Sequence, residues 1–284
     1  VFLLSLLPLA GGYHMNLMKA ESPGPSVSKL VPKVQSTAKI LYTIYFGMTL
    51  IQLALLLIGR VPLFDSLCIT FGTAGTGGFG IVNDSLGSYS TYCQVVTTIF
   101  MILFGVNFSA YYLVLTKKFR QAFKYEEVRY YFGIIAVAIV IIALNTAHLF
   151  RNLLTAFQQA AFQVGSIITT TGFSSTDFNQ WPALSKTVLV LLMFVGACAG
   201  STGGGIKVSR ILILCKAAKK EFQLYLHPNA VKKIKMDDKV ITHDILRSTN
   251  IYISLYLMIF AASVLLIAID NFDLITNFTA VTAT

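Results

Sequence analysis

Five long segments without a charged residue constrain this chain more than any other feature of its sequence. They cover residues 40–58, 85–116, 130–150, 187–206 and 248–269. Each reaches the ~18 to 20 residues that a helix needs to cross a bilayer. The composition agrees, because only 12% of the residues are charged, whereas a soluble domain carries about 25%. The sequence therefore predicts an all-α membrane protein that crosses the bilayer several times.

Basic residues gather in alternate loops between these segments. Of the 22 Lys and Arg residues, four lie in residues 19–39, five in residues 117–129 and ten in residues 207–247. This alternation follows the positive-inside rule, so we expect these three stretches in the cytoplasm. The net charge of +10 then reflects membrane topology. No nucleic-acid partner is expected, because the longest polar stretch, residues 216–247, is too short for a recognisable DNA-binding module.

Two shorter apolar segments predict pore loops. Residues 64–80 and 152–174 are too short or too interrupted to span, and each lies between two spanning segments. Such a segment indicates a re-entrant helix, which is tolerated at membrane depth where protein or a water-filled cavity surrounds it. The Gly-Phe pair that begins at Gly78 recurs 94 residues later, at Gly172. The chain therefore predicts repeated units of helix, pore loop and helix.

The repeat divides the chain into five expected parts. They are the end of a first unit with a cytoplasmic linker (residues 1–39), a second unit (40–124), a third unit (125–220), a cytoplasmic linker (221–247) and the start of a fourth unit that stops in its pore helix (248–284). The pore loop of the first unit is expected before Val1, and that of the fourth unit beyond Thr284.

The residues after each short segment suit a potassium filter. Such a filter replaces the water shell of the ion with backbone carbonyl oxygens, and glycine permits the positive φ angles that align them. The candidate filter residues are Thr76, Gly77, Gly78 and Phe79 in the second unit, and Thr170, Thr171, Gly172 and Phe173 in the third. The expected potassium ligands are the backbone carbonyls of Thr76, Gly77, Gly78, Thr170, Thr171 and Gly172.

A glycine-rich string, residues 196–207, interrupts the fourth apolar segment. It contains the candidate gate residues Gly200, Gly203, Gly204 and Gly205 and ends at Lys207. A broken helix at membrane depth is typical of a transport pathway. Two interpretations stay open for Lys207, which is either a functional charge at the break or a lysine that extends to the cytoplasmic interface.

Other kinds of chemistry fit the sequence poorly. The letters from Gly75 to Gly80 satisfy a dinucleotide-binding fingerprint, but the preceding strand that this motif needs is not expected here. The aspartates fall in loops or at segment ends, and the cysteines and histidines lack metal-ligand spacing. We therefore expect no enzyme activity and no organic cofactor. A secondary transporter with inverted repeats is an alternative, but units repeated in one orientation count against it.

Four strings together resemble the Trk/Ktr/HKT superfamily of potassium transporters, and most closely its TrkH-like membrane subunits. They are AESPGP from residue 20, TAGTGGFG from residue 73, TTTGFSSTDFNQWP from residue 169 and GACAGSTGGGIKVSRI from residue 196. The resemblance implies a pseudo-fourfold pore of four units in one polypeptide, with Gly78 and Gly172 as filter glycines. It also implies that the glycine-rich string and Lys207 form a gate below the filter.

The same resemblance implies a function and partners. It implies uptake of K⁺ across the cell (inner) membrane by a homodimer that contacts membrane lipid. It further implies a cytoplasmic nucleotide-binding regulatory subunit, similar to TrkA, that docks on the basic loops. A sodium-permeable or ion-coupled cation symporter of the same superfamily is the alternative, because members with serine in place of the first-unit filter glycine can favour sodium.

Overall fold

The computed structural model describes residues 34–122, 124–227, 233–237 and 239–283. The AESPGP string and the predicted end of the first unit lie outside these residues. In chain order, the α-helices are α3 Val34–Ile58, α4 Leu63–Ala74, α5 Thr91–Phe104, α6 Phe108–Leu115, α7 Phe119–Ala122, α8 Glu126–Thr146, α9 Leu153–Ile168, α10 Ala183–Val195, α11 Val208–Leu226, α12 His243–Ile267 and α13 Leu274–Ala283. Short 3-10 helices are η1 Ala147–Leu149, η2 Phe178–Gln180 and η3 Ala268–Asp270, and the strands are β1 Lys235–Met236 and β2 Lys239–Val240.

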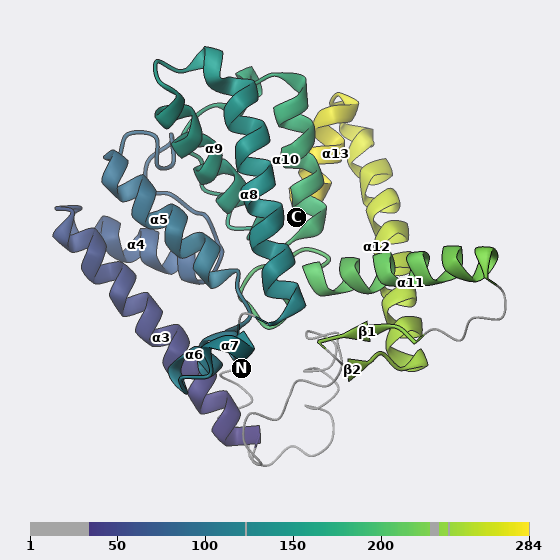
Figure 1. Ribbon diagram of the computed structural model, residues 1–284. Coiled ribbons are helices and arrows are strands. Elements are labelled where there is room, and N and C mark those ends of the chain that lie inside the picture. The colour runs from purple at the N-terminus through teal and green to yellow at the C-terminus, as the bar shows by residue number, and fades with distance from the viewer. Residues whose placement is uncertain (1–33, 123, 228–232, 238, 284) are drawn as a thin grey trace.

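Two consecutive sets of helices share one arrangement. In the first set, the short helix α4 packs against α3 and α5, and in the second set α9 packs against α8 and α10. Helix α9 also packs against α5, so the two sets are joined through their short helices. Figure 1 shows the sets side by side, with α12 and α13 beginning a third set beside α10.

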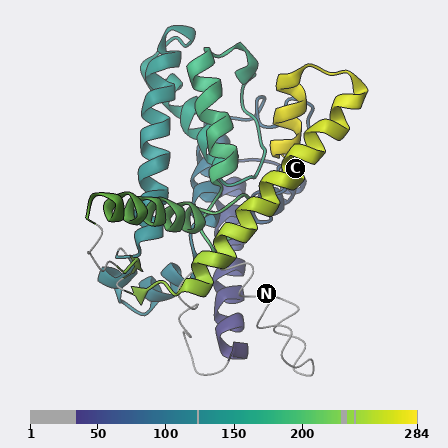
Figure 2. The same ribbon diagram turned by 90° about the vertical axis from the view of Figure 1, so that its right-hand side faces the viewer.

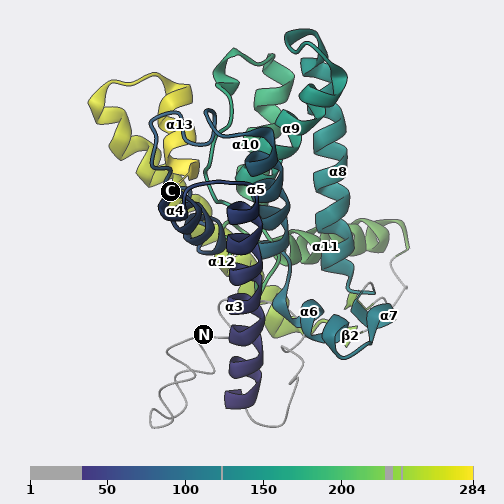
Figure 3. The ribbon, with the colours of Figure 1, turned by 90° about the vertical axis from the view of Figure 1, so that its left-hand side faces the viewer.

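Among the described residues, three helices are long and apolar enough to cross a membrane. These spans are Lys39–Ile58 in α3, Glu126–Leu149 in and after α8, and His243–Asp270 in and after α12. Figures 2 and 3 show that all three helices start from the end of the molecule that holds α6 and α7. Many of their apolar side chains are exposed, such as Met258 and Leu265 of α12. An outward apolar face suits helices surrounded by lipid, which offers no partner for polar groups.

Two of the five predicted spanning segments are not continuous helices. The break in residues 187–206 agrees with the interruption predicted from its glycines, whereas the bend in residues 85–116 corrects the expectation from its length. Residues 85–116 form α5 and α6, which are bent by 95°. The bend follows Gly105, and α6 starts where the Asn107 side chain accepts the Ser109 N–H at 2.8 Å. In residues 187–206, α10 ends at Val195 because Gly196 takes a φ of 70°. A segment without charged residues can lie within the membrane, but individual residues in it decide whether its helix is continuous.

The buried side chains form two main clusters that follow the two sets of helices. One surrounds α8, α9 and α10 and includes Tyr131, Ile142 and Ile168. The other surrounds α3, α4 and α5, but it also contains Phe162 of α9 and Phe173 of the loop after α9. The predicted pore loop of the third unit is therefore part of the core of the second unit.

A small hairpin in the predicted linker 221–247 was not expected from the sequence. Its strands are antiparallel, with Lys235 paired to Val240 and Met236 to Lys239. Apolar side chains at and beside the strands pack on Ile213 of α11. Helix α11 begins beside the lower end of α8 and passes across α12 in Figure 1, and the hairpin lies below it.

We expect Gly105→Ala to lower the thermal stability of the protein. An added Cβ atom would overlap the Tyr131 hydroxyl and lie 2.8 Å from Cγ2 of Thr169, and overpacking of this kind costs ~1 to 3 kcal/mol. The apparent melting temperature in detergent should fall by several degrees. Gly133→Ala is the matched control, because nothing lies within 4 Å of its added Cβ and alanine favours the helix by up to ~1 kcal/mol. Equal melting temperatures for the two variants would contradict the close packing at the bend.

Candidate ion pathway

The loop after α4 turns back against the end of that helix. The carbonyl oxygen of Gly72 accepts hydrogen bonds from the N–H groups of Gly77, at 2.8 Å, and Gly78, at 3.3 Å. Thr76 and Gly78 have positive φ angles of 51° and 65°, and Gly77 between them does not. Alternating backbone conformations of this kind allow successive carbonyl groups to face one side, which is what a carbonyl-lined filter needs.

The loop after α9 repeats this pattern at positions 94 residues later. The carbonyl oxygen of Ser166 accepts hydrogen bonds from the N–H groups of Thr171, at 2.9 Å, and Gly172, at 3.3 Å. Thr170 and Gly172 have φ angles of 56° and 91°. The two loops, which the sequence predicted to be equivalent, thus also share the same backbone hydrogen bonds.

The two loops lie in contact with each other. A Cβ atom at Gly78 would overlap the carbonyl oxygen of Thr171 and lie 2.9 Å from the carbonyl carbon of Gly172. The N–H of Ser174 donates to the Ser85 hydroxyl at 3.1 Å and so ties the following segments together. The structure therefore brings the predicted filter residues of both units to one place, next to the C-terminal ends of α4 and α9. These helix ends carry partial negative charge, which favours a cation.

The two predicted filter phenylalanines have different surroundings. Phe173 is only 1% exposed, and a Cβ atom at Gly72 would lie 2.8 Å from its ring. The Ser166 hydroxyl donates to the Phe173 carbonyl oxygen at 2.5 Å. Phe79, in contrast, is 85% exposed. The side chain of Phe173 thus packs the loop of one unit against the short helix of the other.

The glycine-rich string lies directly against the threonines that begin both loops. The Thr76 hydroxyl donates a hydrogen bond to the carbonyl oxygen of Thr202 at 3.1 Å. The N–H of Gly204 donates to the Thr170 hydroxyl at 2.6 Å. One segment therefore contacts the equivalent residue of each predicted filter loop.

The same string supplies hydrogen-bond partners at the bend between α5 and α6. The N–H of Cys198 donates to the Gly105 carbonyl oxygen at 3.0 Å, and the Gly200 carbonyl oxygen accepts from the N–H of Phe108 at 3.1 Å. Backbone groups at membrane depth need partners within the protein. The backbone groups left unpaired at the bend between α5 and α6 are thus paired with backbone groups of the string that follows α10.

The predicted gate residues all lie in this string. Gly200 and Gly205 have positive φ angles of 69° and 78°, as glycine permits, and a Cβ atom at Gly203 or Gly204 would lie 3.0 Å or less from its nearest neighbour. Lys207 has a φ of 80°, and its ammonium group donates to the Gly203 carbonyl oxygen. The ammonium group of Lys207 thus lies at the break, next to the backbone of the string.

Glu127 at the start of α8 is a residue of this region that sequence reasoning missed. It is 4% exposed, and its carboxylate accepts the N–H groups of Ala199, at 2.6 Å, and Ser209, at 3.2 Å. In the sequence, Glu126 and Glu127 stand just before the apolar segment 130–150 and resemble ordinary loop charges. Only the fold shows that the second of them faces the glycine-rich string.

Comparison with known proteins places this arrangement in a family. A family model described as TrkH, cation transport protein, matches residues 1–284. The chain belongs to the TrkH family. The resemblance stated from the four strings is confirmed, and the helices and loops described above are the TrkH version of a pore-loop membrane fold. Family membership places the chain among cation transport proteins.

Individual TrkH proteins agree with this assignment. The Trk system potassium uptake protein TrkH of Salmonella typhimurium (strain LT2) is 33% identical over 289 residues, which cover 100% of this chain and 60% of that protein. The TrkH of Escherichia coli (strain K12) is 32% identical over the same shares. A crystal structure of the potassium transporter TrkH from Vibrio parahaemolyticus matches with a TM-score of 0.85 at 30% identity, covering 94% of this chain and 58% of that chain. This chain thus spans about three fifths of the length of these relatives.

We expect Thr170→Val to loosen the glycine-rich string of this TrkH-family chain. Valine keeps the branched shape but removes the acceptor of the Gly204 N–H, and one hydrogen bond is worth about 1 kcal/mol, or about fivefold. Amide hydrogen exchange of peptides that cover Gly204 should therefore become about fivefold faster. Thr170→Ser keeps the hydroxyl and should exchange within twofold of the unsubstituted protein. Equal exchange in the valine and serine variants would show that this hydrogen bond does not hold the string.

Proposed function

We propose that this chain is part of a potassium uptake protein whose ion path runs between the two loops and past the glycine-rich string. One observation carries the proposal. Two loops with the same hydrogen bonds lie in contact, and the threonine that begins each of them is bonded to that one string. The names of the relatives, which are potassium uptake proteins, point in the same direction.

In the proposed filter, backbone carbonyls replace the water shell of K⁺. The ligands are the carbonyl oxygens of Thr76, Gly77, Gly78, Thr170, Thr171 and Gly172. The C-terminal ends of α4 and α9 add negative potential to the same place. The ion follows the membrane potential, which supplies about 2.3 kcal/mol per charge for each 100 mV.

In the proposed gate, the glycine-rich string blocks the inner end of the filter. An ion that leaves the filter past Thr76 or Thr170 meets the backbone at Thr202 and Gly204. The ammonium group of Lys207, bound to Gly203, adds a positive charge that repels the ion. Conduction therefore requires the string to move aside, and its glycines give the backbone the freedom to do so.

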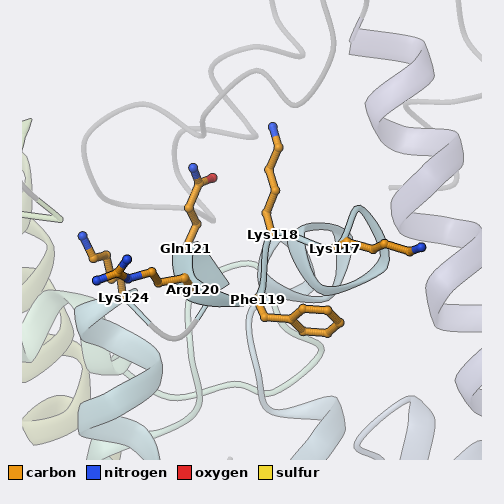
Figure 4. A pocket seen from close by; sticks show the side chains of 6 residues that line it. All are labelled: Lys117, Lys118, Phe119, Arg120, Gln121 and Lys124. Carbon is orange, nitrogen blue, oxygen red and sulfur yellow. The ribbon is translucent and has the colours of Figure 1, made fainter.

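The proposal includes a place in the cell (inner) membrane, a homodimer and a cytoplasmic regulatory subunit that binds a nucleotide. The described basic loops offer a surface for an acidic partner. Figure 4 shows one pocket of this surface, in which Lys118 and Gln121 point the same way while Arg120 and Lys124 lie together. Complementary charges speed the encounter of two partners more than they tighten the complex. Effects of a nucleotide on ion flux should therefore need the partner and weaken as salt is raised.

Gly172→Ser in the full-length protein tests the filter. A Cβ atom there meets nothing within 4 Å, but the φ of 91° costs a side chain ~1 to 2 kcal/mol, so the loop should relax and move its carbonyls. In cells that lack other potassium uptake, we expect at least tenfold slower rubidium uptake, used as the tracer for K⁺, and poorer exclusion of sodium.

Gly133→Ser is the matched control, since it adds the same side chain to α8 without a neighbour within 4 Å. It should take up rubidium at the rate of the unsubstituted protein. Unchanged uptake and sodium exclusion in Gly172→Ser would refute the filter. Equal uptake of sodium and potassium by the unsubstituted protein would instead support the alternative of a sodium-permeable symporter.

A further inference from the structure

Glu127 is a buried acidic residue that is not part of the proposed filter or gate. Its carboxylate lies beneath the glycine-rich string, and one oxygen atom, Oε1, accepts both the Ala199 N–H and the Ser209 N–H. The Asn107 side chain, at the bend between α5 and α6, makes a further hydrogen bond with it. A buried charge is costly unless hydrogen bonds compensate it, so each of these contacts constrains the groups around it.

The two N–H groups belong to two consecutive segments, the glycine-rich string and the helix after it. Ala199 lies inside the string, whereas Ser209 lies in the first turn of α11, the helix that follows the string. The first N–H groups of a helix have no partner within it, and the residue that precedes α11, Lys207, provides no side-chain cap. Glu127 therefore caps α11 from a different helix, and its negative charge suits the positive end of the helix dipole.

The start of α8, which carries Glu127, is itself held from the cytoplasmic side. The Asp237 carboxylate, in the turn of the hairpin, accepts the N–H of Glu126 at 2.7 Å. Lys216 of α11 forms an ion pair with the Glu126 side chain and donates to the Lys235 carbonyl oxygen at 2.7 Å. Burial raises the pKa of Asp237. Glu127 thus projects from a fixed point toward a string whose glycines make it deformable.

We propose that Glu127 is a positioning residue that holds the glycine-rich string in its blocking position by binding the string and the start of α11 at once. The proposal rests on the gate described above. Without this acceptor, two buried N–H groups lose their partner together, and the string is free to leave the inner end of the filter. The backbone turns of the filter loops should stay as they are, because the Gly72 and Ser166 carbonyl groups that form them belong to α4 and α9.

Cys198 offers a native reporter for this role. It lies in the string beside Ala199 and is 0% exposed, as is Cys93 in the core of α5, whereas Cys215 of α11 is exposed. N-ethylmaleimide labelling of the full-length protein in membranes, followed by peptide mass spectrometry, measures all three thiols at once. Cys215 reports the delivery of the reagent, and Cys93 reports general loosening of the fold.

Glu127→Met and Glu127→Gln form a matched pair, because they have similar size and differ in the acceptor oxygen. We expect Cys198 to be labelled at least about tenfold faster in Glu127→Met, since hydrogen bonds to a charged group are worth more than neutral ones. In Glu127→Gln the rate should stay within about threefold of the unsubstituted protein. Glu221→Gln makes the same charge change at an exposed position of α11 and should leave Cys198 within twofold.

Protection of Cys198 in Glu127→Met, or an equal gain at Cys93, would overturn the proposal. If Glu127→Met yields no folded protein, Glu127→Asp replaces it with the same expected gain, because it withdraws the carboxylate by one methylene. Rubidium uptake without the regulatory subunit should rise along with the labelling of Cys198, while sodium exclusion stays unchanged. Faster labelling with unchanged uptake would leave the role of Glu127 intact and refute the gate instead.

Discussion

The hydrogen bond from the Phe108 N–H to the Gly200 carbonyl oxygen links the bend between α5 and α6 to the string that follows α10. A break in a membrane helix leaves N–H and C=O groups that must find partners in the protein. Here α5 and α6 separate at Gly105, and the string after α10 supplies groups to fill the gap. Each break is stable because the other exists, and the string is thereby placed beneath the two loops.

The repeat of 94 residues explains why two loops of different sequence reach the same geometry. In the second unit Gly72 provides the carbonyl that turns the loop, and in the third unit Ser166 does so. The backbone bonds are identical, so they need no particular side chain. What differs is the added bond from the Ser166 hydroxyl to Phe173, which fixes the phenylalanine that fills the space beside Gly72. The two loops therefore share their backbone hydrogen bonds but differ in how their side chains pack.

The sequence predicted much of the architecture because lipid imposes simple rules. Length and charge identified α3, α8 and α12, and short apolar segments identified α4 and α9. The bend at Gly105 escaped prediction because an isolated glycine in an apolar segment is compatible with a continuous helix. The role of Asn107 as the cap of α6 becomes visible only from its hydrogen bond with the Ser109 N–H. Glu127 escaped because its two partners lie 72 and 82 residues away. Patterns along the chain indicate where helices lie, whereas contacts across the fold decide which charged residue faces the glycine-rich string.

Thr76 and Thr170 show how strain is balanced in this region. A branched side chain at positive φ costs ~1 to 3 kcal/mol and persists only where its surroundings fix it. Glycine at these positions would avoid the strain, but it would lose the hydroxyl groups. The Thr170 hydroxyl donates to the Thr169 carbonyl oxygen at 2.7 Å and accepts the Gly204 N–H. The single proton of the Thr76 hydroxyl is shared between the carbonyl oxygens of Gly75, at 2.8 Å, and Thr202, at 3.1 Å. The string therefore contributes to holding both threonine side chains, while the backbone turns of the two loops depend on the carbonyl groups of Gly72 and Ser166 and not on the string.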